Sequence, residues 1–304
     1  MEISIVVPVY NSAMILVNLC QQISSALKDR DFEVILVNDG SSDESWSVIE
    51  SISKKSEQVK GVCLNRNFGQ DNAIMAGMHY AKGDYIVIMD DDLQHSPFDI
   101  VTLLHEAESG CDVCYADYSD RKRQSWWKNI GSILNSKQAE FLLEKPRNIY
   151  LSPFKIINRV VADSIISYKG PYPYLDGLIF RATTSIRQIS VKHHERFHGA
   201  GNYNLRKSFS VFVKHATGFS VVPLRIATLC GLATAIAGVI LASAYIYRYF
   251  VDDKPLEGWT TLVVLVLFMG GMILVSLGMI GEYLGRVYLS INQRPQFVVR
   301  EITR

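Results

Sequence analysis

Two long segments without a charged residue, 226–247 and 259–281, constrain this 304-residue chain more than any other feature. Each exceeds the roughly 20 residues that an α-helix needs to cross the hydrocarbon core of a membrane. Two buried core helices are the alternative, but charge-free runs of this length disfavour it. The link at 248–258 is too short for a domain, so we expect a transmembrane helical hairpin.

The distribution of Lys and Arg around these segments indicates how the hairpin is oriented. Cytoplasmic flanks of membrane helices are enriched in both residues. The link carries more acidic than basic residues, whereas the outer flanks are basic: Arg206, Lys207, Lys214 and Arg225 before the first segment, and Arg286, Arg294, Arg300 and Arg304 after the second. We therefore expect both chain ends in the cytoplasm and the link, around Asp252, on the opposite side.

Composition narrows the class of protein further. Hydrophobic residues make up 48% and charged residues 20%, which excludes a disordered chain. A formal net charge of +1 argues against a nucleic-acid partner. Acidic residues without Lys or Arg occupy 84–120, and the stretches 121–147 and 181–225 are mostly basic. Such a pattern fits a protein that handles a metal ion and phosphates.

The N-terminal part alternates between strand and helix patterns. The helical patterns separate a series of apolar strands, and Ser41 and Glu44 have the spacing of a capping box before the second helix. Repeated βα units predict a mostly parallel sheet covered on both faces, with ligands bound beyond the carboxyl ends of the strands. The expected strands are 3–9, 32–37, 59–64, 85–89 and 112–116.

Three adjacent carboxylates, Asp90–Asp91–Asp92, follow the fourth expected strand. They repel one another unless a cation lies among them, and Mg²⁺ prefers oxygen ligands of this kind. In an extended strand tip, alternation places Asp90 and Asp92 on the same side. A solvated acidic turn is the alternative, and we favour a metal site held by Asp90 and Asp92.

Two further strand tips carry residues suited to a nucleotide. Asp39 can accept hydrogen bonds from a base or a ribose, or form an Asx turn with Gly40, and the two roles are compatible. Arg66, close to Gly69, suits a phosphate contact, with a surface ion pair as the alternative. Neither the dinucleotide-binding nor the P-loop glycine motif occurs, which removes the main support for redox chemistry and for P-loop hydrolysis.

Taken together, these motifs resemble family 2 glycosyltransferases of the GT-A fold. The resemblance rests on Pro-Val-Tyr-Asn at 8–11, the segment 37–43, Asn-Arg-Asn-Phe-Gly-Gln at 65–70, Ala-Gly at 76–77 and Asp-Asp-Asp-Leu-Gln at 90–94. With its hairpin the chain resembles the membrane-anchored polyprenyl-phosphate glycosyltransferases, a group that includes dolichol-phosphate mannose synthases. Residues 281–288 are similar to the bacterial branch, which includes undecaprenyl-phosphate sugar transferases.

This resemblance implies an α/β enzyme of the bacterial inner membrane that forms a homo-oligomer. It implies an inverting transfer of sugar from a nucleotide sugar, a UDP-sugar before others, to undecaprenyl phosphate or another polyprenyl phosphate. Mg²⁺ or Mn²⁺ would bridge Asp90, Asp92 and the donor diphosphate. The donor-binding residues that it implies are Pro8, Tyr10, Asn11, Asp39, Arg66, Gln70, Asp90 and Asp91.

The expected domain boundaries follow from this resemblance and from the pattern of apolar residues. Residues 1–204 form the cytoplasmic catalytic domain, and residues 205–224 form an amphipathic helix at the membrane interface. Residues 225–304 contain the two spans and a cytoplasmic C-terminal tail. The amphipathic segment brings the basic residues Arg206 and Lys207 next to the membrane surface.

The catalytic residues depart from the pattern of the family. Many relatives carry an Asp, proposed as the base, in the segment matching 151–155, and this chain has none there. Asp176 is the nearest candidate, with a turn residue before Gly177 as the alternative. A phosphomonoester has a second pKa of ~6, so the acceptor is already nucleophilic at neutral pH and mainly needs cations. We expect Arg206 and Lys207 to supply them.

Two other functions stay open at this point. One is a membrane glycosyltransferase with a saccharide acceptor, although two spans make a poor channel for a polymer. The other is a non-catalytic membrane scaffold that keeps only the fold, which the presence of both Asp90 and Asp92 disfavours.

Overall fold

The computed structural model forms two compact units, one built on a β-sheet and one on a helical hairpin. The sheet unit comprises Met1–Asn202 and Gln293–Arg304, and the hairpin unit comprises Tyr203–Asn292. The structure describes all residues except 118–148, 171–172, 192–221, 252–257, 293–294 and 304.

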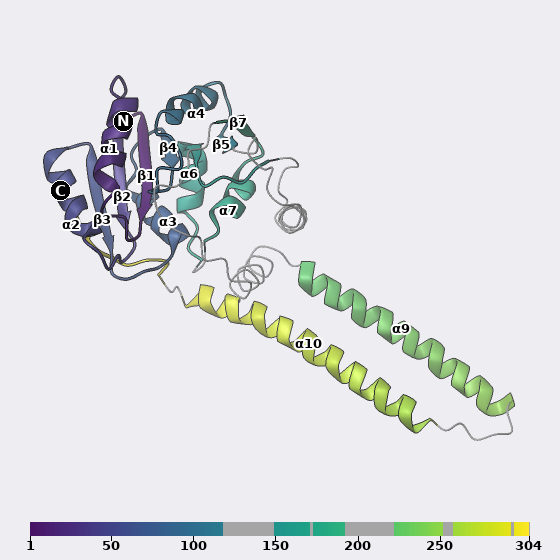
Figure 1. The fold of residues 1–304 in the computed structure, drawn as a ribbon. Helices are drawn as coiled ribbons and strands as arrows, with labels where there is room; N and C mark the ends of the chain where they lie inside the picture. Colours follow the sequence, from purple (N-terminus) through teal and green to yellow (C-terminus); the bar gives the residue numbers. More distant parts are fainter. Residues whose placement is uncertain (118–148, 171–172, 192–221, 252–257, 293–294, 304) are drawn as a thin grey trace. The chain divides into compact units, whose positions relative to one another are not determined.

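The sheet unit contains an eight-stranded sheet in the order β7-β5-β6-β4-β1-β2-β3-β8 (Figure 1). Among the described strands only β6 and β8 run antiparallel to their neighbours, so the prediction of a mostly parallel sheet is confirmed. The strands are β1 Ile3–Val9, β2 Phe32–Asn38, β3 Val59–Leu64, β4 Tyr85–Ile88, β5 Val113–Asp117, β6 Lys155–Asn158, β7 Ile186–Ser190 and β8 Val299–Ile302.

Helices cover both faces of this sheet. Leu19, Ile49 and Leu103, from α1, α2 and α4, join one core cluster with β1 and β2. On α3 the close approach to the sheet depends on Gly77, because a Cβ there would collide with Val6. The helices of this unit are α1 Leu16–Ala26, α2 Ser45–Lys55, α3 Gln70–Tyr80, α4 Asp99–Glu108, α6 Arg159–Ile166 and α7 Leu175–Ala182.

The capping box expected at Ser41 and Glu44 is wrong. Helix α2 begins after Glu44, and no side chain caps it with a hydrogen bond. The side chain that bonds the backbone near the start of α2 is that of Asp43. Its Oδ1 accepts the Ser45 backbone N–H at 3.0 Å, and its Oδ2 accepts the Ala13 N–H at 3.1 Å. The carboxylate therefore links the start of α2 to the loop after β1, which a local sequence pattern does not reveal.

The C-terminal tail returns to the sheet unit. After the second apolar segment, β8 pairs with β3 in antiparallel fashion and closes that edge of the sheet. The sequence predicts a tail there but no strand, since the pairing joins residues more than two hundred positions apart.

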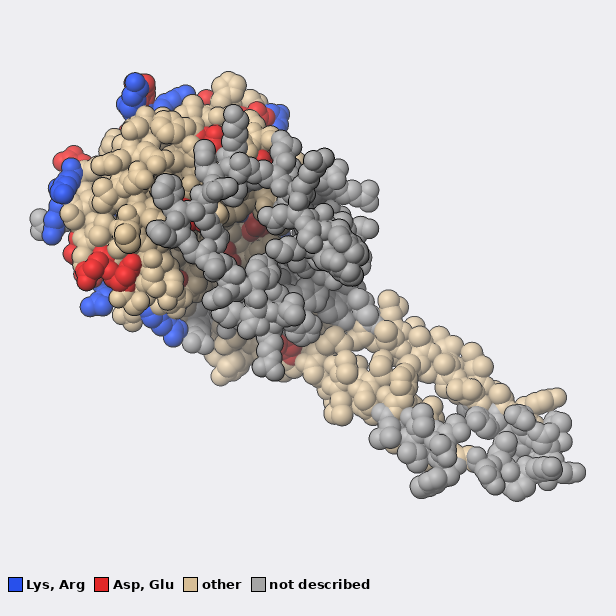
Figure 2. Space-filling model, viewed as in Figure 1, with Lys and Arg blue, Asp and Glu red and all other residues tan. Residues whose placement is uncertain are grey.

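The hairpin unit consists of α9 Val222–Val251 and α10 Trp259–Ile291, which contact each other. Charged side chains are scarce on the described surface of these helices, in contrast to the sheet unit (Figure 2). Among the described residues, one stretch, Phe268–Leu289, is long and apolar enough to span a membrane, and Ala227–Leu241 is a shorter apolar helix. The helix predicted at 205–224 lies outside the described residues except for its last three.

Candidate functional site

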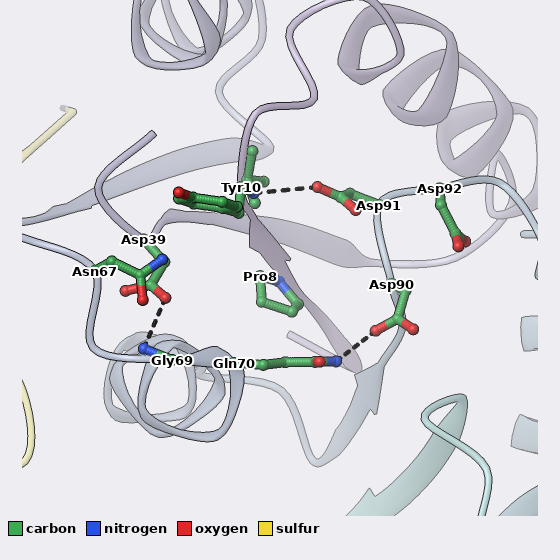
Figure 3. A pocket seen from close by; sticks show the side chains of 10 residues that line it. Pro8, Tyr10, Asp39, Asn67, Gly69, Gln70, Asp90, Asp91 and Asp92 are labelled. Atoms are coloured by element: carbon green, nitrogen blue, oxygen red, sulfur yellow. Dashed lines mark hydrogen bonds between the residues drawn. The ribbon is translucent and has the colours of Figure 1, made fainter. Parts of the chain in front are cut away.

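A pocket of about 320 Å³ lies at the carboxyl edge of the sheet, where β1, β2 and β4 end beside the N-terminus of α3. Figure 3 shows its side chains arriving from these separate segments. The lining residues are Pro8, Val9, Tyr10, Asp39, Asn67, Gly69, Gln70, Asp90, Asp91 and Asp92. Parallel strands bring their carboxyl ends to one edge, so the polar strand tips converge as the sequence predicts.

Asp39 organises the loop between β3 and α3, residues 65–69. Its carboxylate accepts the backbone N–H groups of Phe68 at 2.7 Å and of Gly69 at 2.9 Å, and the side chain is buried. Burial raises the pKa of Asp39, and the two backbone hydrogen bonds oppose that shift. An Asx turn with Gly40 was the alternative role for Asp39; the side chain that bonds the local backbone here is that of Asn38, whose Oδ1 accepts the Ser41 N–H.

A glycine is required beside Asp39. Gly40 has a φ of +66°, and a Cβ at this position would lie 2.5 Å from the backbone nitrogen of Asn67. The tip of β2 therefore touches the same loop twice, through a carboxylate and through a glycine without a side chain. Both contacts fix the backbone on which Asn67 and Gly69 line the pocket.

The three carboxylates after β4 have different partners. Asp90 Oδ1 accepts a hydrogen bond from Gln70 Nε2 at 2.7 Å, and Asp91 Oδ2 accepts the Tyr10 backbone N–H at 3.3 Å (Figure 3). Asp92 Oδ1 accepts the backbone N–H of Gln94 at 3.1 Å. Burial is the main cause of a raised pKa at Asp91.

The strand tip is shorter than the extended tip that we expected. β4 ends at Ile88, and Asp91 and Asp92 lie in a turn, so simple alternation does not govern their directions. Within the described residues, no group of three or more His, Cys, Asp or Glu side chains is arranged to hold a metal. Two pocket carboxylates still fit Mg²⁺ or Mn²⁺, because such ions often take one or two protein carboxylates and complete their shell with substrate phosphates and water.

Two residues expected at the donor site do not line this pocket. Asn11, with a φ of +56°, accepts hydrogen bonds from Ser42 through its side-chain oxygen. Arg66 is exposed, and its guanidinium lies over the Phe68 ring, 4.8 Å from the ring centre. Asn11 therefore supports the neighbouring loop rather than the pocket wall.

Three pocket residues had no individual role predicted from the sequence: Val9, Asn67 and Gly69. All three belong to the motifs at 8–11 and 65–70, so membership of a motif at a strand tip was the available signal. Their residue types, an apolar side chain, an amide and a glycine, carry no chemistry that points to a ligand by itself.

Asp176, expected as a catalytic candidate, is not among the pocket-lining residues. It forms an ion pair with Lys155, and its Oδ1 accepts the Tyr115 hydroxyl hydrogen at 2.8 Å. The side chains of Lys155 and Asp176 are only 4% and 16% exposed. Lys155 begins β6 and pairs with Ile88, the last residue of β4, so this buried pair lies close to the strand end that Asp90 follows. Arg206 and Lys207 lie outside the described residues.

Asp71, in the first turn of α3, adds a second carboxylate near this pair. Burial, and secondly the negative charge of Asp176, raises its pKa from 3.8 to about 6, while Lys155 opposes the shift. The unfolded chain ionises at lower pH than the folded protein. Stability should therefore fall as the pH rises from about 4 to about 6 and then level off.

Asp71→Asn is expected to remove this pH dependence. At pH 7.5 the variant should be more stable than the parent by roughly 1–2 kcal/mol, because the cost of ionising a partly buried carboxyl disappears. Denaturant unfolding at pH 4.5 and 7.5 measures the difference, with the exposed Asp29→Asn as the control. An unchanged pH slope in Asp71→Asn would assign the dependence to other groups.

The fold and the pocket together define a nucleotide-sugar glycosyltransferase of the GT-A type, and the family comparisons agree. Residues 4–166 match the family model described as Glycosyl transferase family 2, which covers more than half of the chain. The chain belongs to this family. Residues 222–287 match a second model, the GtrB C-terminal hairpin, so both halves of the chain have a recognised counterpart.

Similar proteins align along almost the whole chain. An undecaprenyl-phosphate 4-deoxy-4-formamido-L-arabinose transferase from Pseudomonas savastanoi is 30% identical, with 99% of this chain and 91% of that protein covered. A bactoprenol glucosyl transferase from Shigella phage SfII is 27% identical, with 100% of this chain and 99% of that protein covered.

The fold of the sheet unit also has a counterpart among solved structures. Glucosyl-3-phosphoglycerate synthase from Mycobacterium tuberculosis, in complex with Mn²⁺, uridine diphosphate and phosphoglyceric acid, aligns with a TM-score of 0.54 at 17% identity. The alignment covers 71% of this chain and 76% of that one. At this identity the comparison establishes the shared GT-A fold.

Proposed function

We propose that this protein transfers a sugar from a UDP-sugar to a polyprenyl phosphate, undecaprenyl phosphate in bacteria, at the cytoplasmic face of the membrane. The observation that carries the proposal is the combination, in one chain, of a family 2 glycosyltransferase domain and the C-terminal hairpin. Two relatives that align with nearly the whole chain are named for transfer to undecaprenyl phosphate or bactoprenol. These two act on different sugars, so the sugar of this chain stays open.

The pocket supports the donor half of the proposal. Uridine diphosphate would lie over the ends of β1 and β2, with Asp39 and the 65–69 loop around the nucleoside and the three carboxylates near the diphosphate. Asp90 and Asp92 would hold Mg²⁺ or Mn²⁺, which neutralises charge on the diphosphate when it is bound. Gln70 orients Asp90 through their 2.7 Å hydrogen bond. Arg66, which is exposed on the 65–69 loop, is suited to a phosphate contact.

The reaction needs little proton chemistry from the protein. An oxygen of the acceptor phosphate attacks the anomeric carbon, the bond from that carbon to the diphosphate oxygen breaks, and UDP leaves with the electron pair. Attack from the opposite face inverts the anomeric configuration. The acceptor is mostly dianionic at neutral pH, so its repulsion from the diphosphate is the main obstacle. We assign Arg206 and Lys207 to the capture of this phosphate.

A panel assay tests the proposed function. Purified protein is mixed with undecaprenyl phosphate, Mg²⁺ or Mn²⁺ and single nucleotide sugars, and mass spectrometry reads the lipid products. We expect one UDP-sugar to yield a lipid heavier by one glycosyl residue, which is joined to the lipid through the acceptor's own phosphate. Metal-dependent hydrolysis of the donor without any lipid product would favour a saccharide acceptor, and no turnover of any donor would favour a scaffold.

The membrane topology belongs to the same proposal, with two spans at about 226–247 and 259–281 and both termini in the cytoplasm. Asp252→Cys, made in a Cys230→Ser background, should react with an impermeant thiol reagent in intact cells. The background matters because Cys230 is exposed, whereas the other four cysteines are buried. Labelling only after lysis would reverse the orientation.

A further inference from the structure

The C-terminal tail, residues 295–303, contacts both ends of the segment that carries part of the pocket. At the start of that segment, the Asn65 backbone N–H donates to the Val298 carbonyl at 2.9 Å. At its far end, the Phe297 ring meets His79 of α3 edge-on, with the ring centroids 5.4 Å apart. Between Asn65 and His79 lie the pocket residues Asn67, Gly69 and Gln70.

The pairing of β8 with β3 places the tail beside the start of the 65–69 loop. β8 pairs with β3 up to Leu64, the residue before the loop, and the register shifts between Cys63 and Leu64. A bulge of this kind bends a strand and re-aims the residues that follow it. Without β8, β3 would be an edge strand, and its last N–H groups would lack a partner in the sheet.

The tail is itself anchored at two further points. Gln296 Nε2 donates to the carbonyl oxygens of Tyr168 at 2.6 Å and Gly170 at 2.8 Å. At the opposite end, Thr303 Oγ1 accepts the Gly61 N–H at 2.7 Å and lies 3.0 Å from Ser53 Oγ. Figure 1 shows the chain end beside α2 and β3, in agreement with these contacts. A segment fixed at both ends can hold a loop in place.

The 65–69 loop is therefore held by contacts from two separate segments, the tip of β2 and the C-terminal tail. Asp39 and Gly40 at the tip of β2 hold Phe68, Gly69 and the Asn67 backbone on one side, and the tail holds Asn65 on the other. The pocket-facing residues Asn67 and Gly69 belong to the part that the β2 tip holds, and the tail holds the loop at its start, where it leaves β3. A loop that is ordered before the ligand arrives loses less conformational entropy on binding.

We propose that residues 295–303 position the 65–69 loop of the donor site. The affinity of the pocket for the nucleotide then depends on this tail. This inference rests on the proposed function only in taking the pocket as the site of a nucleoside diphosphate. It assigns a positioning role to Gln296, Phe297 and the Val298 carbonyl, none of which lines the pocket.

The test uses the full chain in detergent with the double variant Gln296→Ala/Phe297→Ala, which loosens the tail next to the loop and keeps β8. Hydrogen–deuterium exchange without ligand should become faster at Phe68 and Gly69, whose N–H groups bond Asp39. The Kd for UDP, measured by calorimetry with Mn²⁺, should rise about tenfold, as expected from lost preorganisation. Phe297→Leu, a milder change, should shift both readouts in the same direction.

Thr303→Val is the matched control, since it breaks contacts of the same tail at the end remote from the loop. It should lower stability and leave loop exchange and the Kd unchanged. Unchanged exchange and affinity in the double variant, or equal effects in Thr303→Val, would overturn the proposal. If the parent itself does not bind UDP, the assigned donor is wrong, and the exchange data on the free protein still decide whether the tail positions the loop.

Discussion

Asp92→Asn is expected to abolish sugar transfer while leaving the fold intact. Asn keeps an oxygen that can accept the Gln94 N–H, now at 3.1 Å, so the turn after β4 should persist. What disappears is the negative charge that would hold Mg²⁺ or Mn²⁺ against the donor diphosphate. Metal stabilisation of transferring groups is worth several kcal/mol, so the rate should fall by a factor on the order of 1,000.

Asp84→Asn is the matched control for this experiment. Asp84 precedes β4 at the end of the strand remote from the pocket, and its side chain is exposed. This variant should retain the parent rate, and circular dichroism should give similar melting curves for both variants and the parent. If Asp92→Asn keeps near-normal activity at saturating metal, Asp92 does not hold the metal.

The central sheet was predictable because each of its first five strands has a local sequence pattern. The first five strands are apolar runs between helical patterns, and burial on both faces of a parallel sheet produces such runs. β1 is buried along its whole length, and β2 likewise, so their boundaries were easy to place. The strands β6, β7 and β8 were missed. The antiparallel strands β6 and β8 do not follow the repeating βα pattern, and β8 depends on a partner far away in the sequence.

The sequence predicted which strand tips form the pocket, but not which side chains and backbone groups are hydrogen-bonded there. Asp39, Gln70 and Asp90 were expected near one another because parallel strands share an edge. The sequence does not reveal that Asp39 bonds the backbone of the 65–69 loop or that Gln70 bonds Asp90, since these partners are 20 to 30 positions apart. Asn11 was expected at the donor site and does not line this pocket, and its hydrogen-bond partner Ser42 comes from the next βα unit.

The buried pair of Lys155 and Asp176 gave no signal in the sequence. Lys155 sits alone in an apolar strand pattern, and Asp176 was interpreted as a catalytic candidate or as a turn residue before Gly177. The structure joins them, and it adds the Tyr115 hydroxyl on the same carboxylate oxygen. Lys155 Nζ also lies 4.9 Å from the centre of the Tyr115 ring. Burial, and secondly Asp176, keeps the pKa of Tyr115 well above its ordinary value, so this phenol stays a hydrogen-bond donor.

Removing either charge of this pair is expected to destabilise the protein strongly. Lys155→Met leaves Asp176 without its cation, and Asp176→Leu leaves an almost fully buried ammonium group unpaired. Losing one partner of a buried ion pair typically costs about 3–5 kcal/mol, mostly through the desolvated charge left behind. Denaturant unfolding measures the loss. Asp176→Asn should be milder, because the amide oxygen can still accept from Tyr115.

The double variant Lys155→Met/Asp176→Leu separates a structural role of this pair from a catalytic one. Because both charges leave together, its stability should return to within roughly 1–2 kcal/mol of the parent. A double variant as unstable as the single ones would show that the ion pair is not the cause of their instability.

Once stability is restored, the transfer rate becomes informative about Asp176. If the acceptor phosphate needs no protein base, as its dianionic charge at neutral pH implies, activity should recover along with stability. If Asp176→Asn and a stable double variant are both inactive at every pH, while Arg206→Ala and Lys207→Ala keep a normal dependence on lipid concentration, the cation-capture mechanism is wrong and Asp176 is the base.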